Sequence, residues 1–212
     1  MKIDSEEKII DSKKGSLTLM EHFYTIQGEG FNSGKPAYFL RIGGCDVGCV
    51  WCDVKESWDA SKHPITSDFE MLELVKKTHA VNVVITGGEP LMYNMDSLTE
   101  LLQNNNLHTW LETSGAYPMS GQWDWVCLSP KKFKKPVEDI YQYANELKII
   151  VYNKTDFDWA LEHAKKVNEA CILYLQPEWS KEKEMMPLII DFVKEHPNWT
   201  ISLQTHKYMN IP

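Results

Sequence analysis

The sequence predicts an α/β fold with a mainly parallel sheet, arranged as an open, partial TIM-like barrel of about six strand–helix units. Two observations support this prediction. Short apolar runs alternate with amphipathic stretches along the 212 residues. Most of the runs are apolar at successive positions, as expected for strands that are covered on both faces. We therefore expect a single domain over residues 1–212, with residues 1–18 at its periphery.

The strands are predicted from runs that are rich in β-branched and aromatic residues. In chain order they lie at residues 38–42, 81–86, 108–113, 124–129, 146–152, 170–176 and 200–204. Residues 15–26 are a candidate for a further strand at the edge of the sheet.

The helices are predicted from apolar residues at helical spacing between these runs. They lie at residues 66–79, 96–105, 155–170 and 181–196. Thr66 or Ser67 is expected to cap the first helix, and Asp96 or Ser97 the second. Pro187 falls inside the last pattern, so that helix should start near it or kink there.

Composition excludes several classes of function. The net charge is −8 and no basic block occurs, so binding to a nucleic acid is not expected. The N-terminus has no signal-peptide pattern and no apolar run is long enough for a membrane span, so we expect a soluble cytoplasmic protein. Of the five cysteines, Cys127 and Cys171 stand alone in apolar runs and are expected in the core.

A polar or Gly-rich segment follows most of the predicted strands. These segments lie at residues 43–53, 87–90, 113–115, 129–132, 176–179 and 204–212. In parallel α/β sheets the ligand site lies at the carboxyl ends of the strands. We therefore expect these segments to converge on one site.

The first of these segments contains three cysteines, Cys45, Cys49 and Cys52. A structural zinc site needs four ligands, and His63 could be the fourth only after a ten-residue excursion. A [4Fe–4S] cluster held by three thiolates would instead leave one iron open to a further ligand. At this point both a closed zinc site and an open cluster remain possible.

Two motifs together resemble those of the radical S-adenosylmethionine (SAM) superfamily, namely CDVGCVWC at 45–52 and ITGGEP at 85–90. Within that superfamily the chain resembles the 7-carboxy-7-deazaguanine synthase family of queuosine biosynthesis. The further likeness consists of IQGEG at 26–30, an arginine in the strand before the cysteines, and QTHK near the end of the sequence. The resemblance covers nearly the whole chain from Glu21 to Pro212.

The resemblance implies one [4Fe–4S] cluster on Cys45, Cys49 and Cys52, with S-adenosyl-L-methionine chelating the open iron. Trp51, between two of the ligands, would shield the cluster. The residues implied to bind the cofactor are Gly87, Gly88, Glu89, Gly115, Ser129, Pro130, Lys131, Gln176, Pro177, Glu178 and Trp179.

The implied substrate is 6-carboxy-5,6,7,8-tetrahydropterin. A 5′-deoxyadenosyl radical would abstract hydrogen from its C6, and ring contraction with loss of ammonia would give 7-carboxy-7-deazaguanine, with regeneration of the cofactor. Glu29, Arg41 and His206 are the candidate catalytic residues, and Arg41 suits the substrate carboxylate. The implied substrate-binding set is Ile26, Gln27, Gly28, Glu29, Arg41, Thr113, His206 and the terminal carboxylate of Pro212. A homodimer and a flavodoxin or ferredoxin reductant are implied as well.

The sequence departs from the family at one position. Val54 stands where family members commonly have a threonine whose hydroxyl binds Mg2+, so we expect a weakened Mg2+ requirement, with Asp53 or water as substitute. The alternatives are a glycyl-radical-enzyme activase of the same superfamily and, more remotely, a zinc or iron–sulfur sensor protein.

Overall fold

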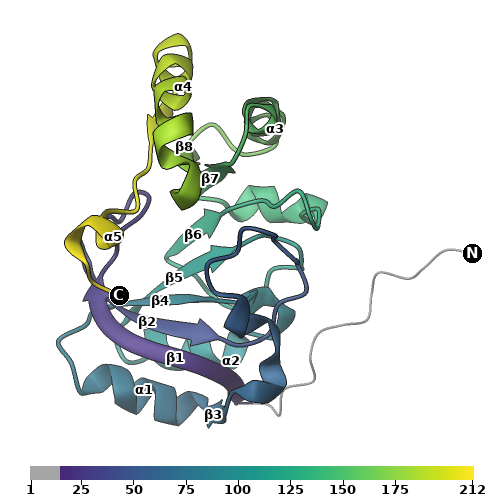
Figure 1. Cartoon of the computed structure of the whole chain (residues 1–212). Helices are drawn as coiled ribbons and strands as arrows, with labels where there is room; N and C mark the ends of the chain where they lie inside the picture. Colours follow the sequence, from purple (N-terminus) through teal and green to yellow (C-terminus); the bar gives the residue numbers. More distant parts are fainter. Residues whose placement is uncertain (1–14) are drawn as a thin grey trace, which may run out of the picture.

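The structure, a computed structural model, describes residues 15–212 and contains one continuous nine-stranded sheet (Figure 1). Its order is β3-β1-β2-β4-β5-β6-β7-β8-β9. The strands are β1 (Ser16–Ile26), β2 (Pro36–Ile42), β3 (Ile65–Ser67), β4 (Asn82–Gly87), β5 (His108–Thr113), β6 (Trp125–Leu128), β7 (Glu146–Val151), β8 (Ile172–Pro177) and β9 (Trp199–Ile201). β2 and β4 to β9 are parallel, whereas β1 is antiparallel to β2 and β3. The predicted open α/β barrel is therefore confirmed.

The predicted helices are also present. They are α1 (Asp68–Lys76), α2 (Asp96–Gln103), α3 (Thr155–Ala164) and α4 (Glu182–Glu195). The structure also contains a short helix α5 (Thr205–Met209) and the 3-10 helices η1 (Lys55–Trp58), η2 (Ala60–Lys62), η3 (Pro90–Met92), η4 (Glu138–Tyr143) and η5 (Trp179–Lys181). Ser67 caps α1 in a capping box with Glu70. α4 begins at Glu182, so Pro187 lies in its second turn. In residues 15–212 no helix is long and apolar enough to cross a bilayer.

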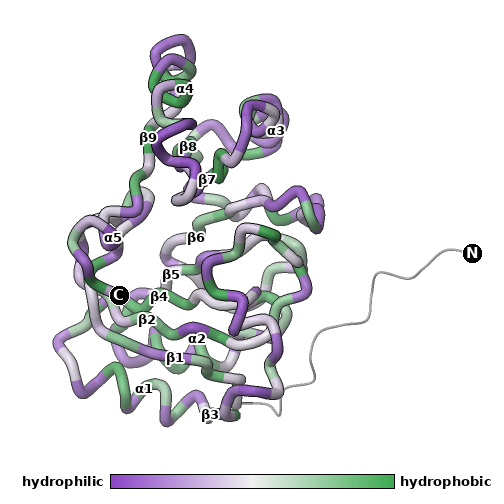
Figure 2. The backbone as a smooth tube through the Cα atoms, in the orientation of Figure 1, coloured by the Kyte–Doolittle hydropathy of each residue, from purple (hydrophilic) through white to green (hydrophobic). Residues whose placement is uncertain are grey.

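The core lies between the sheet and the helices. Strand residues such as Leu40, Ile85 and Leu128 are fully buried there against helix residues such as Met71 and Leu102. Figure 2 shows hydrophobic residues in the central strands and mainly hydrophilic residues in α3. Helices therefore cover the outer face of the sheet and leave its inner face for the site.

Along β2 and β5 the side chains on the inner face of the barrel change from apolar to charged. Side chains two residues apart share a face of a strand, so Phe39 shares the inner face with Arg41, and Trp110 shares it with Glu112. A small cluster around Ala37, Val84 and Trp110 fills the amino-terminal half of the barrel. Charged side chains occupy the carboxyl-terminal half, where the polar segments begin.

The loop between β1 and β2 spans the open side of the barrel. Gly28 accepts a hydrogen bond from the backbone N–H of Thr205 (2.9 Å), and the N–H of Gly30 donates to Ser202 Oγ (3.0 Å). The N–H of Phe31 donates to Glu146 Oε2 (2.8 Å). A β-carbon on Gly28 would lie 2.3 Å from Nδ1 of His206, so only glycine fits there. The loop is thereby held against the strands opposite β1.

The amino-terminal segment that was expected to be peripheral is described only in part. Residues 1–14 lie outside the described residues. Residues 16–18 begin β1, and Leu17 is buried in the core with 3 % of its surface exposed.

Candidate functional site

Two adjoining cavities lie at the carboxyl ends of the parallel strands. The larger has a volume of about 420 Å³ and the smaller about 170 Å³. All six polar segments expected at this end of the sheet contribute lining residues to the larger cavity. The two share the lining residues Glu29, Arg41, Asp53, Val54, Thr86, Glu112 and Gln204. The convergence expected from the sequence is therefore present.

Three free thiols face the larger cavity, those of Cys45, Cys49 and Cys52. Their loop is anchored where it leaves β2, since the N–H of Gly44 donates to the carbonyl of Ser57 (2.6 Å). Burial raises the pKa of Cys45 to about 11 and also raises the pKa of Cys49. Three soft sulfur donors that share one cavity, with no disulfide between them, fit an iron–sulfur cluster held from one side.

A second set of contacts fixes the cysteine loop from the segments that follow β5 and β6. Nζ of Lys134 lies 2.9 and 2.8 Å from the two carboxylate oxygens of Asp46, and the hydroxyl of Tyr117 donates to Asp46 (2.6 Å). Lys134 also lies over the ring of Tyr117, 4.0 Å from its centroid. Hydrogen bonds to Lys134 and Tyr117 outweigh partial burial and lower the pKa of Asp46. We name these three residues the Asp46 clamp.

The turn after β4 lies against the start of the cysteine loop. A β-carbon on Gly88 would lie 2.1 Å from the carbonyl oxygen of Gly44, and the N–H of Glu89 donates to that oxygen (2.9 Å). The buried carboxylate of Glu89 accepts four hydrogen bonds, from Thr113 Oγ1, the N–H of Leu91 and both donors of Ser114. A bound ammonium group would have to displace one of these donors, so the predicted role of Glu89 stays a prediction.

Most of the residues predicted to bind the cofactor line the larger cavity, and two of them do not. Lys131 faces the cysteines and donates to the backbone oxygen (2.6 Å) and hydroxyl (2.5 Å) of Ser129. Burial lowers the pKa of Lys131. Lys131 also lies over the ring of Trp51, 5.9 Å from its centroid. Gly87, Gly88, Glu89, Ser129, Lys131, Gln176, Pro177, Glu178 and Trp179 line the larger cavity, whereas Gly115 and Pro130 line neither cavity.

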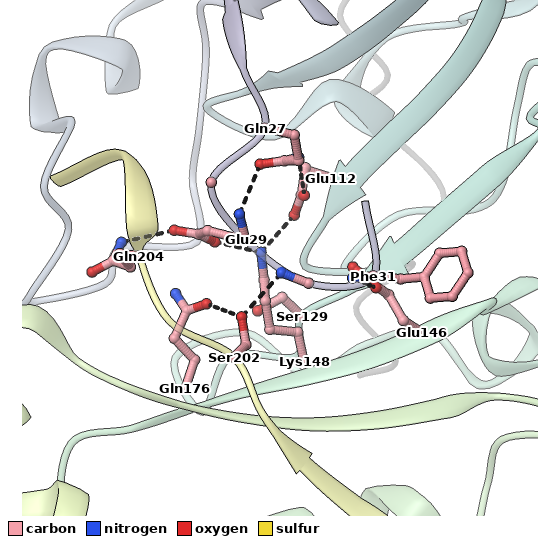
Figure 3. Close-up of polar contacts among 12 residues, drawn as sticks. Gln27, Glu29, Phe31, Glu112, Ser129, Glu146, Lys148, Gln176, Ser202 and Gln204 are labelled. Atoms are coloured by element: carbon pink, nitrogen blue, oxygen red, sulfur yellow. Dashed lines mark hydrogen bonds and ion pairs between the residues drawn. The ribbon is translucent and has the colours of Figure 1, made fainter. Parts of the chain in front are cut away.

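A closed ring of polar contacts forms the floor of the site (Figure 3). Nζ of Lys148 donates to Glu29 Oε2 (2.6 Å) and to Glu112 Oε2 (2.9 Å). Gln27 completes the ring, because its Nε2 donates to Glu112 Oε1 (3.4 Å) and its Oε1 accepts from the N–H of Glu29 (3.1 Å). Gln204 donates to the other oxygen of Glu29 (2.8 Å). The ring links the β1–β2 loop to β5 and β7.

The charges in this ring stabilise one another. Burial alone would raise the pKa of Glu29, but Lys148, Gln204 and His206 together lower it to about 2. Burial likewise opposes the charge of Lys148, yet the surrounding acidic groups raise its pKa well above the usual value. Burial lowers the pKa of His206, which is therefore neutral at pH 7. The site presents fixed carboxylates beside a neutral imidazole.

The predicted substrate residues lie together at the smaller cavity. Ile26, Gln27, Gly28, Glu29, Arg41, His206 and Pro212 line it, whereas Thr113 lines only the larger cavity, with its hydroxyl bonded to Glu89. Arg41 Nε pairs with Glu21 on the neighbouring strand (2.5 Å), and its Nη atoms make no hydrogen bond within residues 15–212. Val54 lines both cavities with the adjacent Asp53, which lies 3.5 Å from Lys207.

Sequence reasoning missed several residues of the site. Thr86, Glu112, Lys148, Gln204 and Lys207 all line the larger cavity. Lys148 and Glu112 could have been recognised as candidates, because each is a charged residue inside an apolar strand run and such a charge is costly to bury without a partner. Gln204 and Lys207 belong to a polar segment that was expected at the site, but nothing in that segment distinguishes them.

The sequence matches the model of the Radical SAM superfamily over residues 40–172. It is 57 % identical over 210 residues to the 7-carboxy-7-deazaguanine synthase of Flavobacterium psychrophilum, covering 99 % of this chain and 100 % of that protein. It is 46 % identical over 196 residues to the 7-carboxy-7-deazaguanine synthase of a Synechocystis species, covering 92 % and 94 %. The fold is similar to the crystal structure of QueE from Escherichia coli, with a TM-score of 0.82, 29 % identity and coverage of 94 % of this chain and 99 % of that chain.

Proposed function

The chain belongs to the radical SAM superfamily and, within it, to the 7-carboxy-7-deazaguanine synthase family, and from this premise we propose that it converts 6-carboxy-5,6,7,8-tetrahydropterin to 7-carboxy-7-deazaguanine with loss of ammonia. The observation that carries the proposal is the shape of the site. Three free cysteines and the ring of charges around Lys148 line one and the same cavity, which adjoins a second, smaller cavity.

Cys45, Cys49 and Cys52 would hold a [4Fe–4S] cluster in the larger cavity, with S-adenosylmethionine beside it. When bound, the cluster and S-adenosylmethionine would supply the radical chemistry that removes a hydrogen atom from the substrate. The chain itself contributes binding, orientation and exclusion of water. Lys131, Gln176 and residues 87–89 of the GGEP turn line the same cavity as the cysteines and the charged ring, which supports a role in orienting the cofactor.

The charged ring suits a flat, donor-rich heterocycle such as a pterin. Glu29 and Glu112 each use two of about four lone-pair sites on protein donors, which leaves acceptor sites for substrate N–H groups. The unbonded Nη atoms of Arg41 suit a carboxylate, because a guanidinium and a carboxylate form paired hydrogen bonds. Neutral His206 offers one donor and one acceptor next to Glu29.

We propose that magnesium contributes little to substrate binding in this protein. Val54 lies at the junction of the two cavities and has no oxygen to offer a metal. Asp53 lines the same junction and is the nearest replacement in sequence, but its carboxylate already forms an ion pair with Lys207.

The family resemblance further supports a homodimer and a flavodoxin or ferredoxin as electron donor. A reducing compartment such as the cytoplasm suits the five free cysteines.

The test is anaerobic incubation of the cluster-loaded protein with a reductant, S-adenosylmethionine and the carboxytetrahydropterin, followed by mass spectrometry. We expect 7-carboxy-7-deazaguanine and ammonia in equal amounts. A loaded protein that cleaves S-adenosylmethionine but leaves the pterin unchanged would refute the synthase assignment and favour a different radical reaction. A colourless protein that binds zinc instead of iron would refute the cluster as well.

A further inference from the structure

Lys148 is a charged residue at the centre of the barrel that the predicted mechanism does not use. It lies in the middle of β7, within the run ELKIIV, and its side chain is only 5 % exposed. An ammonium group that is buried without partners is strongly destabilising. Its two partners, Glu29 and Glu112, are more open, with 18 % and 20 % of their side chains exposed. Lys148 lines the larger cavity together with both carboxylates but is the least exposed of the three.

The contacts of Lys148 fix the relative positions of these two carboxylates. Glu29 comes from the β1–β2 loop and Glu112 from the end of β5, and the direct link between their side chains is the bridging Nζ atom, at 2.6 and 2.9 Å. Gln27 supplies the other side of the ring at longer distances of 3.1 and 3.4 Å. Figure 3 shows both carboxylates directed toward the lysine. The two hydrogen bonds donated by Lys148 are therefore the shortest in the ring.

We propose that Lys148 is a positioning residue for substrate recognition, which holds the carboxylates of Glu29 and Glu112 at a fixed spacing so that both accept N–H donors from one flat heterocycle. The identity of that heterocycle rests on the proposed function. The proposal itself concerns the pair of acceptors, and two neighbouring carboxylates with no cation between them would repel each other.

The electrostatic surroundings of Lys148 are consistent with this role. Glu29, Glu112, Glu146 and Cys127 face it from four different elements, and Lys131 and His206 also interact with it electrostatically. Glu146 is buried, and burial raises its pKa. Without the ammonium group, Glu29 and Glu112 would lie in a mostly acidic pocket. The pKa of Glu29 would then rise, because burial would no longer be opposed by Lys148, and a protonated Glu29 oxygen would no longer accept from the substrate.

The test is Lys148→Met in the cluster-loaded enzyme, with KM and kcat for the carboxytetrahydropterin measured from pH 5.5 to pH 8.5. We expect KM to rise roughly 10- to 100-fold, as for loss of hydrogen bonds to charged groups, with a smaller change in kcat. In the wild type, Glu29 has a pKa of about 2 and stays charged over this pH range, so its protonation should not raise KM at low pH. In the variant, KM should fall as pH rises, because the raised carboxylate pKa brings protonation into this range.

Two further variants separate positioning from folding. Lys148→Met/Glu112→Gln removes the like-charge repulsion, so it should fold and load its cluster even if the single variant does not, and its KM should stay raised. Lys148→Arg keeps the charge and should keep KM independent of pH. The matched control is Lys166→Met, which breaks a surface pair with Glu138 (3.0 Å) and should leave both constants unchanged.

The proposal is overturned if folded, cluster-loaded Lys148→Met shows the wild-type KM and no pH dependence, or, where that variant does not fold, if Lys148→Met/Glu112→Gln shows the wild-type KM. This result would leave the proposed function intact, because the wild type would still form product. Failure of the wild type to form product would instead contradict the proposed function. In that case equilibrium binding of the pterin, measured by fluorescence, tests Lys148 separately. Equal affinities of wild type and Lys148→Met overturn the proposal, as do equal affinities of Glu112→Gln and Lys148→Met/Glu112→Gln where the single lysine variant does not fold.

Discussion

At the residue scale, the site depends on a few groups whose chemistry cannot be exchanged. Cys45, Cys49 and Cys52 provide sulfur donors on one side of the larger cavity, and Arg41 and Lys148 place cations among carboxylates on the other. Each of these cations lies on a strand, where the sheet fixes its direction. Such sites respond sharply to single substitutions, because the partner group is left buried and unpaired.

The first prediction concerns the cluster. Cys52→Ala should abolish the brown chromophore and reduce the iron content from about four atoms per chain to almost none, since two thiolates cannot hold the cluster from one loop. Cys171→Ala is the matched control, because Cys171 is a buried core thiol remote in sequence from the motif, and it should load normally. Iron analysis and visible absorption provide the measurement. Equal iron in the two variants would contradict the assignment.

The second prediction concerns magnesium. Val54→Thr should introduce a stimulation of activity by Mg2+ that the wild type lacks, because threonine has nearly the shape of valine and adds an oxygen at the junction of the cavities. Val54→Ala adds no oxygen and should remain insensitive. The measurement is KM for the pterin with and without Mg2+. A wild type that strictly requires Mg2+ would show that Asp53 or another group already replaces the hydroxyl.

At the element scale, the cysteine loop and the β1–β2 loop are each held by contacts from other loops and from strand ends. The cysteine loop is tied to the turn after β4 through Gly44 and to the segments after β5 and β6 through the Asp46 clamp. The β1–β2 loop is fixed in the same way by Glu146 and Ser202. The strands therefore set the approximate location of each group, and the contacts between loops set its final position.

The third prediction tests the Asp46 clamp. Lys134→Met should accelerate the loss of iron from the loaded protein several-fold, because the cysteine loop loses its ion pair and one of the two groups that hold Asp46. Lys135→Met is the matched control, because Lys135 is exposed and forms no ion pair within the described part of the chain. Release of iron to a chelator gives the rates. Identical rates would mean that the clamp does not restrain the loop.

These same elements show what the sequence could predict. Cysteine spacing and the GGEP segment are local patterns, so they could be recognised directly, and apolar runs located the strands of the parallel sheet. The three-residue strand β3 was missed because Ile65–Ser67 is short and pairs with β1 only through the fold. The partners of Lys148 could not be predicted, since Glu29 and Glu112 lie 119 and 36 residues away. A buried charge marks a site, but its partners follow only from the topology.

At the scale of the whole molecule, the open barrel places the residues that stabilise the fold and the residues of the site on opposite faces of one sheet. Helices cover the outer face of the sheet around an apolar core, and the inner face carries the titratable groups of the site. Among the buried titratable groups on the outer side is His163 of α3, which is 5 % exposed and bonded to the hydroxyl of Tyr141 (2.7 Å). Burial lowers the pKa of His163 from 6.5 to about 4.

The fourth prediction follows from this buried histidine. Between about pH 6.5 and pH 4 the unfolded chain binds a proton at His163 and the folded chain does not, so the free energy of unfolding should fall as pH falls, by about 3 kcal/mol in total. In His163→Asn this contribution disappears, although lost packing against Trp159 lowers stability at all pH values. Chemical denaturation at several pH values measures the difference. Parallel curves for the two proteins would contradict the lowered pKa.

The most direct test of the central claim is the ratio of product formed to S-adenosylmethionine consumed when the cofactor is limiting. The account predicts many molecules of 7-carboxy-7-deazaguanine for each S-adenosylmethionine, because the proposed reaction regenerates it as a cofactor. Arg41 and the charged ring would hold the pterin during each turnover. A protein with about four irons per chain that consumes S-adenosylmethionine and forms no product would contradict it.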